Sequence, residues 1–285
     1  MKLLLTGGTG FIGNYFQNNY GDLYKISTFS FQNDDIHKLV LKDIDTIVHL
    51  SALVHQMGGA SKEEYFNINV DNTLELAKKA KENNVKQFIF MSSVKVYGEE
   101  SNTPYTETTK CEPQDDYGLS KLEAENALKD MEDENFTITI LRTPIVYGYG
   151  VKANIENLIN LVNKVPILPF ANIQNRRSMV YIGNLCHLLD TIIRKQSSGI
   201  FLAADDQALS TSKFISMISE ASHKNNYLIK IPFFESLLKL AKPSFHKRLY
   251  ESLEINNQAS KTKLNFKNMY TTKEGIHHMI YGEDT

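Results

Sequence analysis

Short runs of apolar and β-branched residues recur through the first half of the chain. The runs are KLLLT (2–6), YKISTF (24–29), DTIVHL (45–50), QFIFMSS (87–93) and TITILR (137–142). Continuous runs of this kind are typical of strands that are buried on both faces of a parallel sheet. Between them, 69–84 and 120–135 are rich in Ala, Leu, Glu and Lys at helical spacing. The alternation predicts an α/β fold with a doubly wound parallel sheet.

The pattern loosens after about residue 150. Strand-like segments (179–182 and 199–203) mix there with helical ones (184–195 and 211–221). We therefore expect a sheet domain over 1–150 and a smaller lobe over 151–285 that completes a cleft without folding separately. The amphipathic, basic stretch FFESLLKLAKPSFHKRLY (233–250) favours a helix packed on its own domain over contact with a membrane surface.

Composition and charge narrow the classes of function. The 31 basic and 33 acidic residues nearly cancel, so no overall field attracts nucleic acid. No apolar run approaches the ~18 residues of a membrane span. The apolar run at the start of the chain is too short for a signal peptide. Cys111 and Cys186 show neither a disulfide framework nor metal spacing. We expect reduced thiols, no metal site and a cytoplasmic location.

Regularly spaced glycines connect the first predicted strand to the helix that follows it. Gly7, Gly10 and Gly13 recur at intervals of three in GGTGFIG. The first permits a tight turn, the second lets a phosphate approach the backbone, and the third lets the helix pack close to the strand. The start of the helix offers free N–H groups to a pyrophosphate. The sequence therefore predicts a Rossmann-type dinucleotide site.

Six motifs in order resemble the extended short-chain dehydrogenase/reductases, a family of nucleotide-sugar epimerases, dehydratases and reductases. They are TGGTGFIG (6–13), HLSA (49–52), NVDNT (69–73), SSVKVYG (92–98), YGLSK (117–121) and LRTPIVYG (141–148). The resemblance covers nearly the whole chain. It implies a Rossmann-type sheet with a smaller C-terminal substrate-binding lobe, and a homodimer formed through helices 69–84 and 117–133. The cofactor residues that it implies are Gly7, Gly10, Phe11, Ile12, Gly13, Ser30, Asp35, Ile36, Leu50, Ser51, Ala52, Asn69, Tyr117 and Lys121.

The end of the second predicted strand bears on the choice of cofactor. Members that prefer NAD usually carry an acidic residue there for the ribose hydroxyls, whereas this chain has Ser27, Thr28 and Ser30, with no acid before Asp34. The sequence leans toward NADP(H), or toward use of NADP(H) and NAD(H) alike. Asp35 and the residue after it match the family pair beside the adenine, and a solvated helix start is the alternative.

Tyr117, Lys121 and Ser93 are the candidate catalytic residues. Tyr117 and Lys121 lie one helical turn apart. A neighbouring ammonium stabilises a phenolate and lowers the tyrosine pKa, so we expect Tyr117 to exchange a proton with a carbinol or carbonyl. Ser93 ends a predicted strand, where ligands bind in such sheets, and can bond the reacting oxygen. The resemblance implies that Lys121 also holds the nicotinamide ribose and that Asn69 stiffens the site, an ordinary helix-end asparagine being the alternative.

Lys95 and two histidines raise separate questions. Lys95 follows Ser93 by two positions and faces the substrate with it if the strand continues, the alternative being a lysine turned to solvent. In the family, 4,6-dehydratases carry an Asp-Glu pair where this chain has Val94 and Lys95, and 3,5-epimerase/reductases carry a cysteine at the second position. These departures from the family pattern argue against chemistry at C5.

We interpret His49 as a strand histidine with a local partner and His55 as a candidate at the substrate border.

Residues of the second lobe match the family's nucleotide-sugar contacts. Asn154 resembles an asparagine that contacts the diphosphate, and Arg177 resembles its arginine partner, although Arg176 next to it is an alternative. The segment PILPF (166–170) resembles the edge that holds uracil, which favours UDP over GDP or dTDP.

The residues and the resemblance together predict an NAD(P)-dependent oxidoreductase that acts at C4 of a UDP-hexose. The leading hypothesis is reduction of a UDP-4-keto-6-deoxy-N-acetylhexosamine for capsule or O-antigen synthesis. One alternative is a UDP-hexose 4-epimerase that retains its NAD. The other is a non-catalytic Rossmann protein that senses a cofactor or serves as a scaffold.

Overall fold

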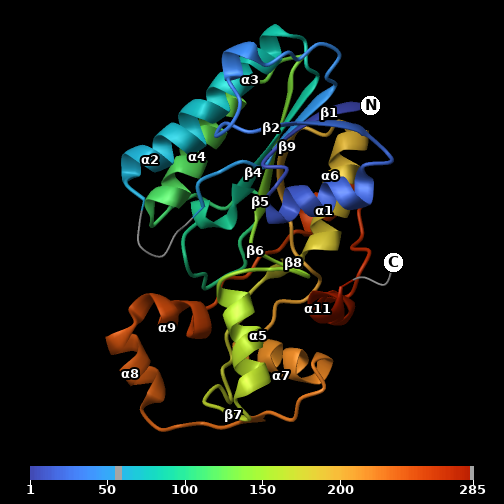
Figure 1. Cartoon of the computed structure of the whole chain (residues 1–285). Coiled ribbons are helices and arrows are strands. Elements are labelled where there is room, and N and C mark those ends of the chain that lie inside the picture. Colours follow the sequence, from blue (N-terminus) through green and yellow to red (C-terminus); the bar gives the residue numbers. More distant parts are fainter. Residues whose placement is uncertain (55–59, 283–285) are drawn as a thin grey trace.

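The computed structural model describes residues 1–54 and 60–282, and its centre is a six-stranded parallel sheet (Figure 1). In spatial order the strands are β2 (Lys25–Phe29), β1 (Lys2–Thr6), β3 (Thr46–His49), β4 (Gln87–Ser93), β5 (Thr137–Thr143) and β9 (Gly199–Leu202). Every neighbouring pair in this sheet is parallel. The chain moves outward from β1 to β2 on one side and to β3 on the other, so a topological switch point lies between β1 and β3. The doubly wound sheet is confirmed.

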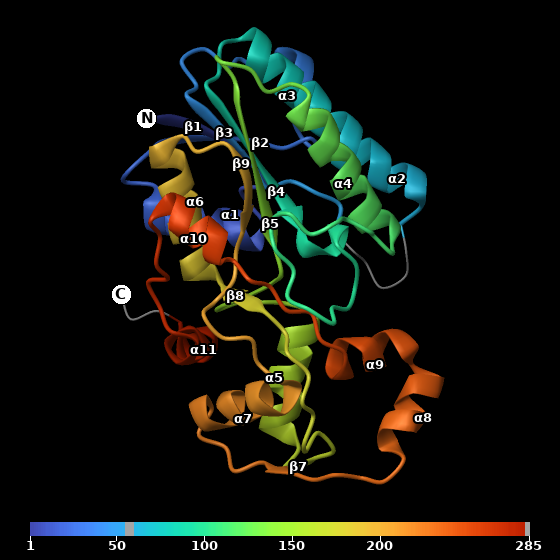
Figure 2. The ribbon, with the colours of Figure 1, turned by 180° about the vertical axis from the view of Figure 1, so that it is seen from behind.

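Helices cover both faces of the sheet (Figures 1 and 2). One face carries α1 (Phe11–Tyr20) and α6 (Ile182–Lys195), and the other carries α2 (Lys62–Phe66), α3 (Asn72–Glu82) and α4 (Asp116–Lys129). Side chains alternate along β1: Leu3 and Leu5 belong to the same core as Phe16 of α1, whereas Leu4 shares a core with Leu76 of α3 and Ala124 of α4. The apolar runs of the sequence thus supply both cores.

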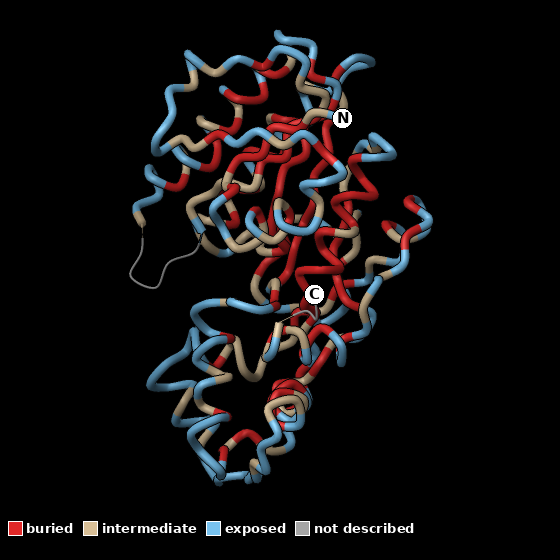
Figure 3. Tube along the Cα trace, turned by 45° about the vertical axis from the view of Figure 1, so that its right-hand side comes forward, coloured by how far each residue is buried: buried red, intermediate tan, exposed pale blue. Residues whose placement is uncertain are grey.

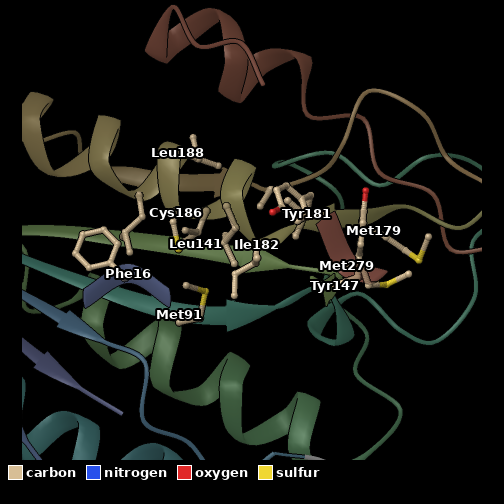
Figure 4. Packing of buried hydrophobic residues seen from close by; sticks show 14 of the residues in the cluster. Phe16, Met91, Leu141, Tyr147, Met179, Tyr181, Ile182, Cys186, Leu188 and Met279 are labelled. Carbon is tan, nitrogen blue, oxygen red and sulfur yellow. The ribbon is translucent and has the colours of Figure 1, made fainter. Parts of the chain in front are cut away.

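The larger core joins the sheet to α1 and α6 (Figure 4). In that view Phe16 and Ile182 of the helices lie beside Met91 of β4 and Leu141 of β5. Cys186 is fully buried among them, and both it and the half-buried Cys111 are free thiols, as predicted. Close packing of this kind fixes the sheet edge on which the candidate site lies.

The smaller lobe lies beyond the carboxyl ends of β4 and β5 (Figure 1). It contains α5 (Asn154–Lys164), α7 (Thr211–Ala221), α8 (Phe234–Ala241), α9 (Pro243–Tyr250) and α11 (Thr272–Tyr281). Two parallel strand pairs complete it, β6 (Ile145–Tyr147) with β8 (Met179–Tyr181) and β7 (Ile167–Leu168) with β10 (Tyr227–Leu228). Helix α10 (Gln258–Leu264) returns to the neighbourhood of α6 and β9. Figure 3 shows how much less of this lobe is buried than of the sheet.

Two segments that we expected in the smaller lobe lie with the sheet instead. Residues 199–202 form β9, which pairs with β5, and Phe201 and Leu202 are fully buried there. Residues 184–195 form most of α6, whose apolar face covers the sheet. Burial decides both positions, because the sheet face would otherwise expose its own apolar residues. The division of the chain at residue 150 stays a prediction.

The stretch 233–250 forms two helices rather than one, whereas Phe234, Leu249 and Tyr250 pack against the larger core, as expected. It breaks between α8 and α9 at Lys242, which has φ −144° and ψ 71°. Pro243 follows, and a proline disfavours the α conformation of the residue before it. No residue of α8 is buried. Among the described residues, no helix is both long and apolar enough to cross a bilayer.

The two predicted helices that would pair with a second copy lie side by side on one face (Figure 1). Residues 69–84 correspond to α3 and to a π-helical turn that precedes it (Asn67–Asp71), and 117–133 corresponds to α4. The homodimer itself stays a prediction.

Candidate active site

The glycine turn between β1 and α1 allows close approach by a ligand. Gly7 has φ +68°, and a Cβ there would lie 2.9 Å from the backbone nitrogen of Ser51. A Cβ on Gly13 would lie 2.3 Å from the carbonyl oxygen of Gly7. Helix α1 begins directly after Gly10, and no side chain caps its first N–H groups. These donors and the absence of side chains fit the pyrophosphate of a dinucleotide.

A buried chain of hydrogen bonds runs from the loop after β3 to α3. The Ser51 N–H donates to Thr6 Oγ1 (3.2 Å), and Thr6 Oγ1 donates to His49 Nδ1 (2.7 Å). His49 Nε2 donates to Thr73 Oγ1 (2.9 Å), whose own proton goes to the carbonyl oxygen of Asn69 (2.8 Å). Burial lowers the pKa of His49 to about 3, so the ring is neutral. His49 is a strand histidine with local partners, as we interpreted it.

Asn69 joins that loop to the catalytic helix. Its Oδ1 accepts from the Leu53 N–H (2.8 Å), while its Nδ2 donates to the Leu53 carbonyl (3.0 Å) and to Ser120 Oγ (3.0 Å). Ser120 in turn donates to the carbonyl oxygen of Tyr117 (2.9 Å). Asn69 is 1% exposed and lies within the π-helical turn; such turns are frequent at functional sites. The contacts set Tyr117 relative to the loop of Leu50, Ser51 and Ala52.

Ser93 and Tyr117 both line a cleft of about 350 Å³ between the sheet and the smaller lobe. Ser93 ends β4, and Tyr117 lies in the first turn of α4. Burial raises the pKa of Tyr117 to about 12, and a hydrogen bond from Ser93 lowers it only in part. This direction is opposite to the one expected from the Tyr-x-x-x-Lys spacing. A phenol in a desolvated site resists ionisation until another positive charge arrives.

Lys121 explains the difference, because its ammonium lies against β4. Its Nζ donates to the carbonyl oxygen of Met91 (2.8 Å) and lies 4.3 Å from the centre of the Phe90 ring. Burial lowers the pKa of Lys121 to about 7, against an opposing effect of Glu125. Lys121 is 2% exposed. The spacing of four residues therefore does not place the charge on the phenol, and Lys121 is not among the residues that line the cleft.

Lys95 lines the cleft but does not extend a strand from Ser93. The strand ends at Ser93, and Val94–Val96 forms a 3₁₀ turn in which the Lys95 N–H donates to Ser93 Oγ (3.2 Å). The Lys95 Nζ pairs with Asp115 and lies 3.0 Å from Glu99 Oε1. Asp115 is also the N-cap of α4, accepting from the Gly118 N–H. Lys95 is therefore tied to the helix that carries Tyr117 rather than turned to open solvent.

Asn154 and Arg177 line the opposite wall of the cleft. Asn154 is the first residue of α5, and Arg177 Nη1 donates to the carbonyl oxygen of Glu251 (3.0 Å). Burial and the nearby charge of Arg248 lower the pKa of Arg177. Two guanidinium groups that repel each other inside a cleft favour an anion between them.

Arg176 faces away from the cleft. Its guanidinium bonds both oxygens of Glu254, at 2.6 and 2.5 Å, on the exposed surface. It is not among the cleft residues, whereas Arg177 is. The structure thus distinguishes the two neighbours that the sequence left as alternatives.

Sequence reasoning missed several residues of the cleft, including Thr143, Ser244, Lys247 and Arg248. Thr143 ends β5 beside Ser93, and the other three belong to α9. The only sequence signal for α9 was the basic pair inside an amphipathic stretch.

The end of β2 carries a carboxylate after all. The Asp34 Oδ2 accepts from the Ser30 N–H (2.8 Å), which brings that acid back to the strand end. Asp35 caps a 3₁₀ turn (Ile36–Lys38) by accepting from the His37 N–H (2.9 Å). Asp35 therefore serves as a helix cap whatever it contacts in a cofactor complex.

His55, the candidate at the substrate border, lies outside the described residues. Across residues 1–54 and 60–282, no three His, Cys, Asp or Glu side chains gather in a way that could hold a metal ion.

Comparison with known proteins agrees with this geometry. The model of the "NAD dependent epimerase/dehydratase family" matches residues 3–204. The chain belongs to this family. A UDP-glucose 4-epimerase of Vibrio cholerae is 34% identical, with 96% of this chain and 93% of that protein covered. An N-acetyl-alpha-D-glucosaminyl-diphospho-ditrans,octacis-undecaprenol 4-epimerase of Escherichia coli O157:H7 is 24% identical over 81% of this chain and 76% of its own length.

Solved structures of named epimerases and reductases share the fold. A UDP-N-acetylglucosamine 4-epimerase from Bacillus cereus superposes with a TM-score of 0.81 at 22% identity, covering 99% of both chains. A dTDP-4-dehydrorhamnose reductase from Bacillus anthracis in complex with NADP gives the same TM-score at 18% identity and the same coverage. Epimerases and reductases thus use one architecture, and the distinction between them depends on local residues.

We predict that Lys121→Met stabilises the cofactor-free protein most at low pH. The pKa of Lys121 falls from ~10.4 in the unfolded chain to about 7 in the fold. Between these values the unfolded chain binds more protons, so wild-type stability rises with pH. The advantage of the variant should be fully present below about pH 7 and shrink toward pH 10. Thermal unfolding at several pH values measures it, with exposed Lys129→Met as the matched control. A gain that does not vary with pH would contradict the argument.

We predict that Lys95→Met moves the pH–rate profile to higher pH. Asp115 raises the pKa of Tyr117, and the ammonium of Lys95 pairs with that carboxylate. Without Lys95 the uncompensated charge raises the tyrosine pKa further, so the phenolate form needs a higher pH. Asp115→Asn keeps an acceptor for the Gly118 N–H and should shift the profile down, and the double variant should lie between. Coincident profiles for all four proteins would show that the pair does not act on Tyr117.

Proposed function

We propose that this protein is an NAD-dependent 4-epimerase of a UDP-hexose, working through a transient ketone at C4. One observation carries the proposal: Ser93 and Tyr117 line one cleft together with Asn154 and Arg177, at the edge of the sheet on which the glycine turn also lies. A hydroxyl and a phenol at this place serve proton exchange on one sugar oxygen. Lys95 is engaged with two carboxylates, so the positions after Ser93 supply no free acid–base pair for C5.

The chemistry divides between the chain and its cofactor. A nicotinamide dinucleotide held at the glycine turn would supply, in its oxidised form, the hydride acceptor for C4 and a positive charge that favours the phenolate. Tyr117 removes the proton of the C4 hydroxyl and later gives it back. Ser93 donates a hydrogen bond to the same oxygen. Return of the hydride to the opposite face of the C4 carbonyl, with the proton given back to its oxygen, would invert that centre.

Two arginines and a neighbouring pocket support a nucleoside diphosphate as the handle of the substrate. Arg177 and Arg248 line the same wall of the cleft and suit a diphosphate. A second pocket of about 370 Å³ follows along the same segments and is lined in part by Pro169, Asn175 and Tyr250. We assign it to the base, in line with the predicted uracil edge at 166–170.

Two observations favour the epimerase over the reductase. The relative with 34% identity over nearly the whole chain is named a UDP-glucose 4-epimerase. The carboxylate of Asp34 lies at the end of β2, where it suits ribose hydroxyls and repels a 2′-phosphate. Both support a tightly held NAD rather than exchangeable NADPH.

Reduction of a UDP-4-keto-6-deoxy-N-acetylhexosamine is the second candidate. The uncharged Ser27, Thr28 and Ser30 favour it, because no acid lies within strand β2 or directly after it. Its proton chemistry at Tyr117 is the same, and only the fate of the cofactor differs. A non-catalytic scaffold is disfavoured by the complete set of Ser93, Tyr117 and Lys121.

The test is incubation with UDP-glucose or UDP-N-acetylglucosamine without added cofactor. We expect the galacto epimer to form, and Tyr117→Phe to fold normally, bind NAD and lose about 10²–10⁴-fold in turnover. Protein that releases no NAD on denaturation, makes no epimer and consumes NADPH with a 4-keto sugar would favour the reductase. Near-normal activity of Tyr117→Phe would contradict both proposals.

We predict that Arg177→Ala weakens UDP-hexose binding by roughly 2–5 kcal/mol, because it removes a desolvated charge from the diphosphate. Arg176→Ala is the matched control and should change the Michaelis constant little, since its ion pair with Glu254 is exposed. Steady-state kinetics on both variants tests the assignment of Arg177 to the diphosphate. Equal effects of the two substitutions would contradict that assignment.

We predict that Asp34→Ala raises the dissociation constant for NAD about tenfold and improves binding of NADP. The neighbouring Asp35→Ala removes a helix cap next to the expected adenine position, so it should affect both cofactors alike, and it is the control. Fluorescence titration with both cofactors measures the ratio. An unchanged ratio of the NAD and NADP dissociation constants would show that Asp34 does not determine the cofactor preference.

A further inference from the structure

An exposed apolar strip follows the outer edge of the smaller lobe. We define the apolar strip as Ile167, Tyr227, Ile229, Ile231, Phe233, Leu237 and Leu240. Phe233 and Leu240 expose 86% and 84% of their surface, and Tyr227 exposes 70%. Side chains of this size are usually buried, so seven of them exposed along one segment and its strand partner require an explanation.

The backbone aligns members of the strip. Tyr227 and Ile167 are register partners in the β10–β7 pair, and residues 227, 229 and 231 alternate along an extended segment, so their side chains share a side. Phe233, Leu237 and Leu240 lie four and three residues apart at α8, which places them on one helix face. The adjoining face of α8 is used internally, since the rings of Phe234 and Phe170 lie 6.2 Å apart. The lobe therefore covers only part of the apolar surface of α8.

The segment that carries most of the strip is strongly basic. Residues 224–250 contain six of the chain's 31 cationic residues and only one of its 33 acidic residues, Glu235. Lys230, Lys239 and Lys242 are exposed beside the strip. The chain as a whole carries a net charge of −2, so this concentration is local.

We infer that the apolar strip binds the surface of an anionic lipid bilayer, with α8 lying in the interfacial plane. Phe233, Leu237 and Leu240 enter the boundary between headgroups and acyl chains, as the apolar face of an interfacial helix does. The lysines contact anionic headgroups, so binding should weaken as salt screens them. The contact is peripheral and reversible, because one short helix buries little area.

Charge argues for lipid over a second copy of this chain. In a twofold contact the same surface meets itself, so Lys239 and Lys242 would face their own like charges with one glutamate to offset them. An anionic bilayer complements the same surface. The apolar side chains between the lysines argue against nucleic acid, which offers them no partner.

Membrane contact would bring the cleft close to the bilayer. Helix α9 follows α8 directly, and His246 Nε2 of α9 lies 3.5 Å from Glu235 Oε1 of α8. Ser244, Lys247 and Arg248 of the same helix line the cleft. The inference does not depend on the reaction proposed above.

The test is co-sedimentation of the full-length protein with vesicles of phosphatidylcholine containing about one-third phosphatidylglycerol. We expect binding that weakens with salt and is lost with pure phosphatidylcholine. Phe233→Ser/Leu240→Ser should bind at least roughly tenfold more weakly and keep its unfolding temperature, because both side chains are exposed. Val40→Ser, which changes a side chain 77% exposed on the sheet domain, is the matched control.

Two outcomes would overturn the inference. One is wild-type protein that stays in the supernatant with anionic vesicles at low salt. The other is a wild-type dimer that Phe233→Ser/Leu240→Ser converts to monomers, measured by light scattering, since the apolar strip would then be an interface between copies.

Discussion

The site depends on one buried carboxamide. The side-chain amide of Asn69 forms hydrogen bonds with both the N–H and the carbonyl of Leu53 and with the Ser120 hydroxyl. Ser120 in turn donates to the carbonyl oxygen of Tyr117. The cofactor loop after β3 and the first turn of α4 are thereby held in one arrangement. Asn69 lies within the π-helical turn, a feature frequent at functional sites. Ser93 needs no such tie, because β4 is buried along its whole length.

Burial gives this site an unusual electrostatic state. It raises the pKa of Tyr117 to about 12 and lowers that of Lys121 to about 7, so both groups tend toward neutrality near pH 8. A phenolate then forms readily only when positive charge is added. The glycine turn lies at this edge of the sheet, and under the proposed function an oxidised nicotinamide bound there would supply that charge. Under the proposed function, proton exchange at Tyr117 would then depend on occupancy of the cofactor site.

Patterns within short stretches of sequence predicted the features that depend on neighbouring residues alone. The apolar runs gave the strands of the sheet, and the glycine spacing located the turn where a Cβ cannot fit. Contacts between segments that are far apart in the chain could not be predicted from such patterns. The place of β9 depends on its burial beside β5, Asp34 reaches the strand end by a turn of the chain, and Arg248 enters the cleft from a helix without a motif. The pairing of Lys95 with Asp115 required the strand to end at Ser93.

The central claim is that hydride leaves C4 of a UDP-hexose and returns to the same carbon while the cofactor stays bound. The most direct measurement uses UDP-galactose carrying deuterium at C4, with the product analysed by mass spectrometry and proton NMR. The account predicts UDP-glucose that keeps the deuterium at C4, without release of reduced cofactor. Deuterium lost to solvent, or transferred to nicotinamide that leaves the protein, would contradict it.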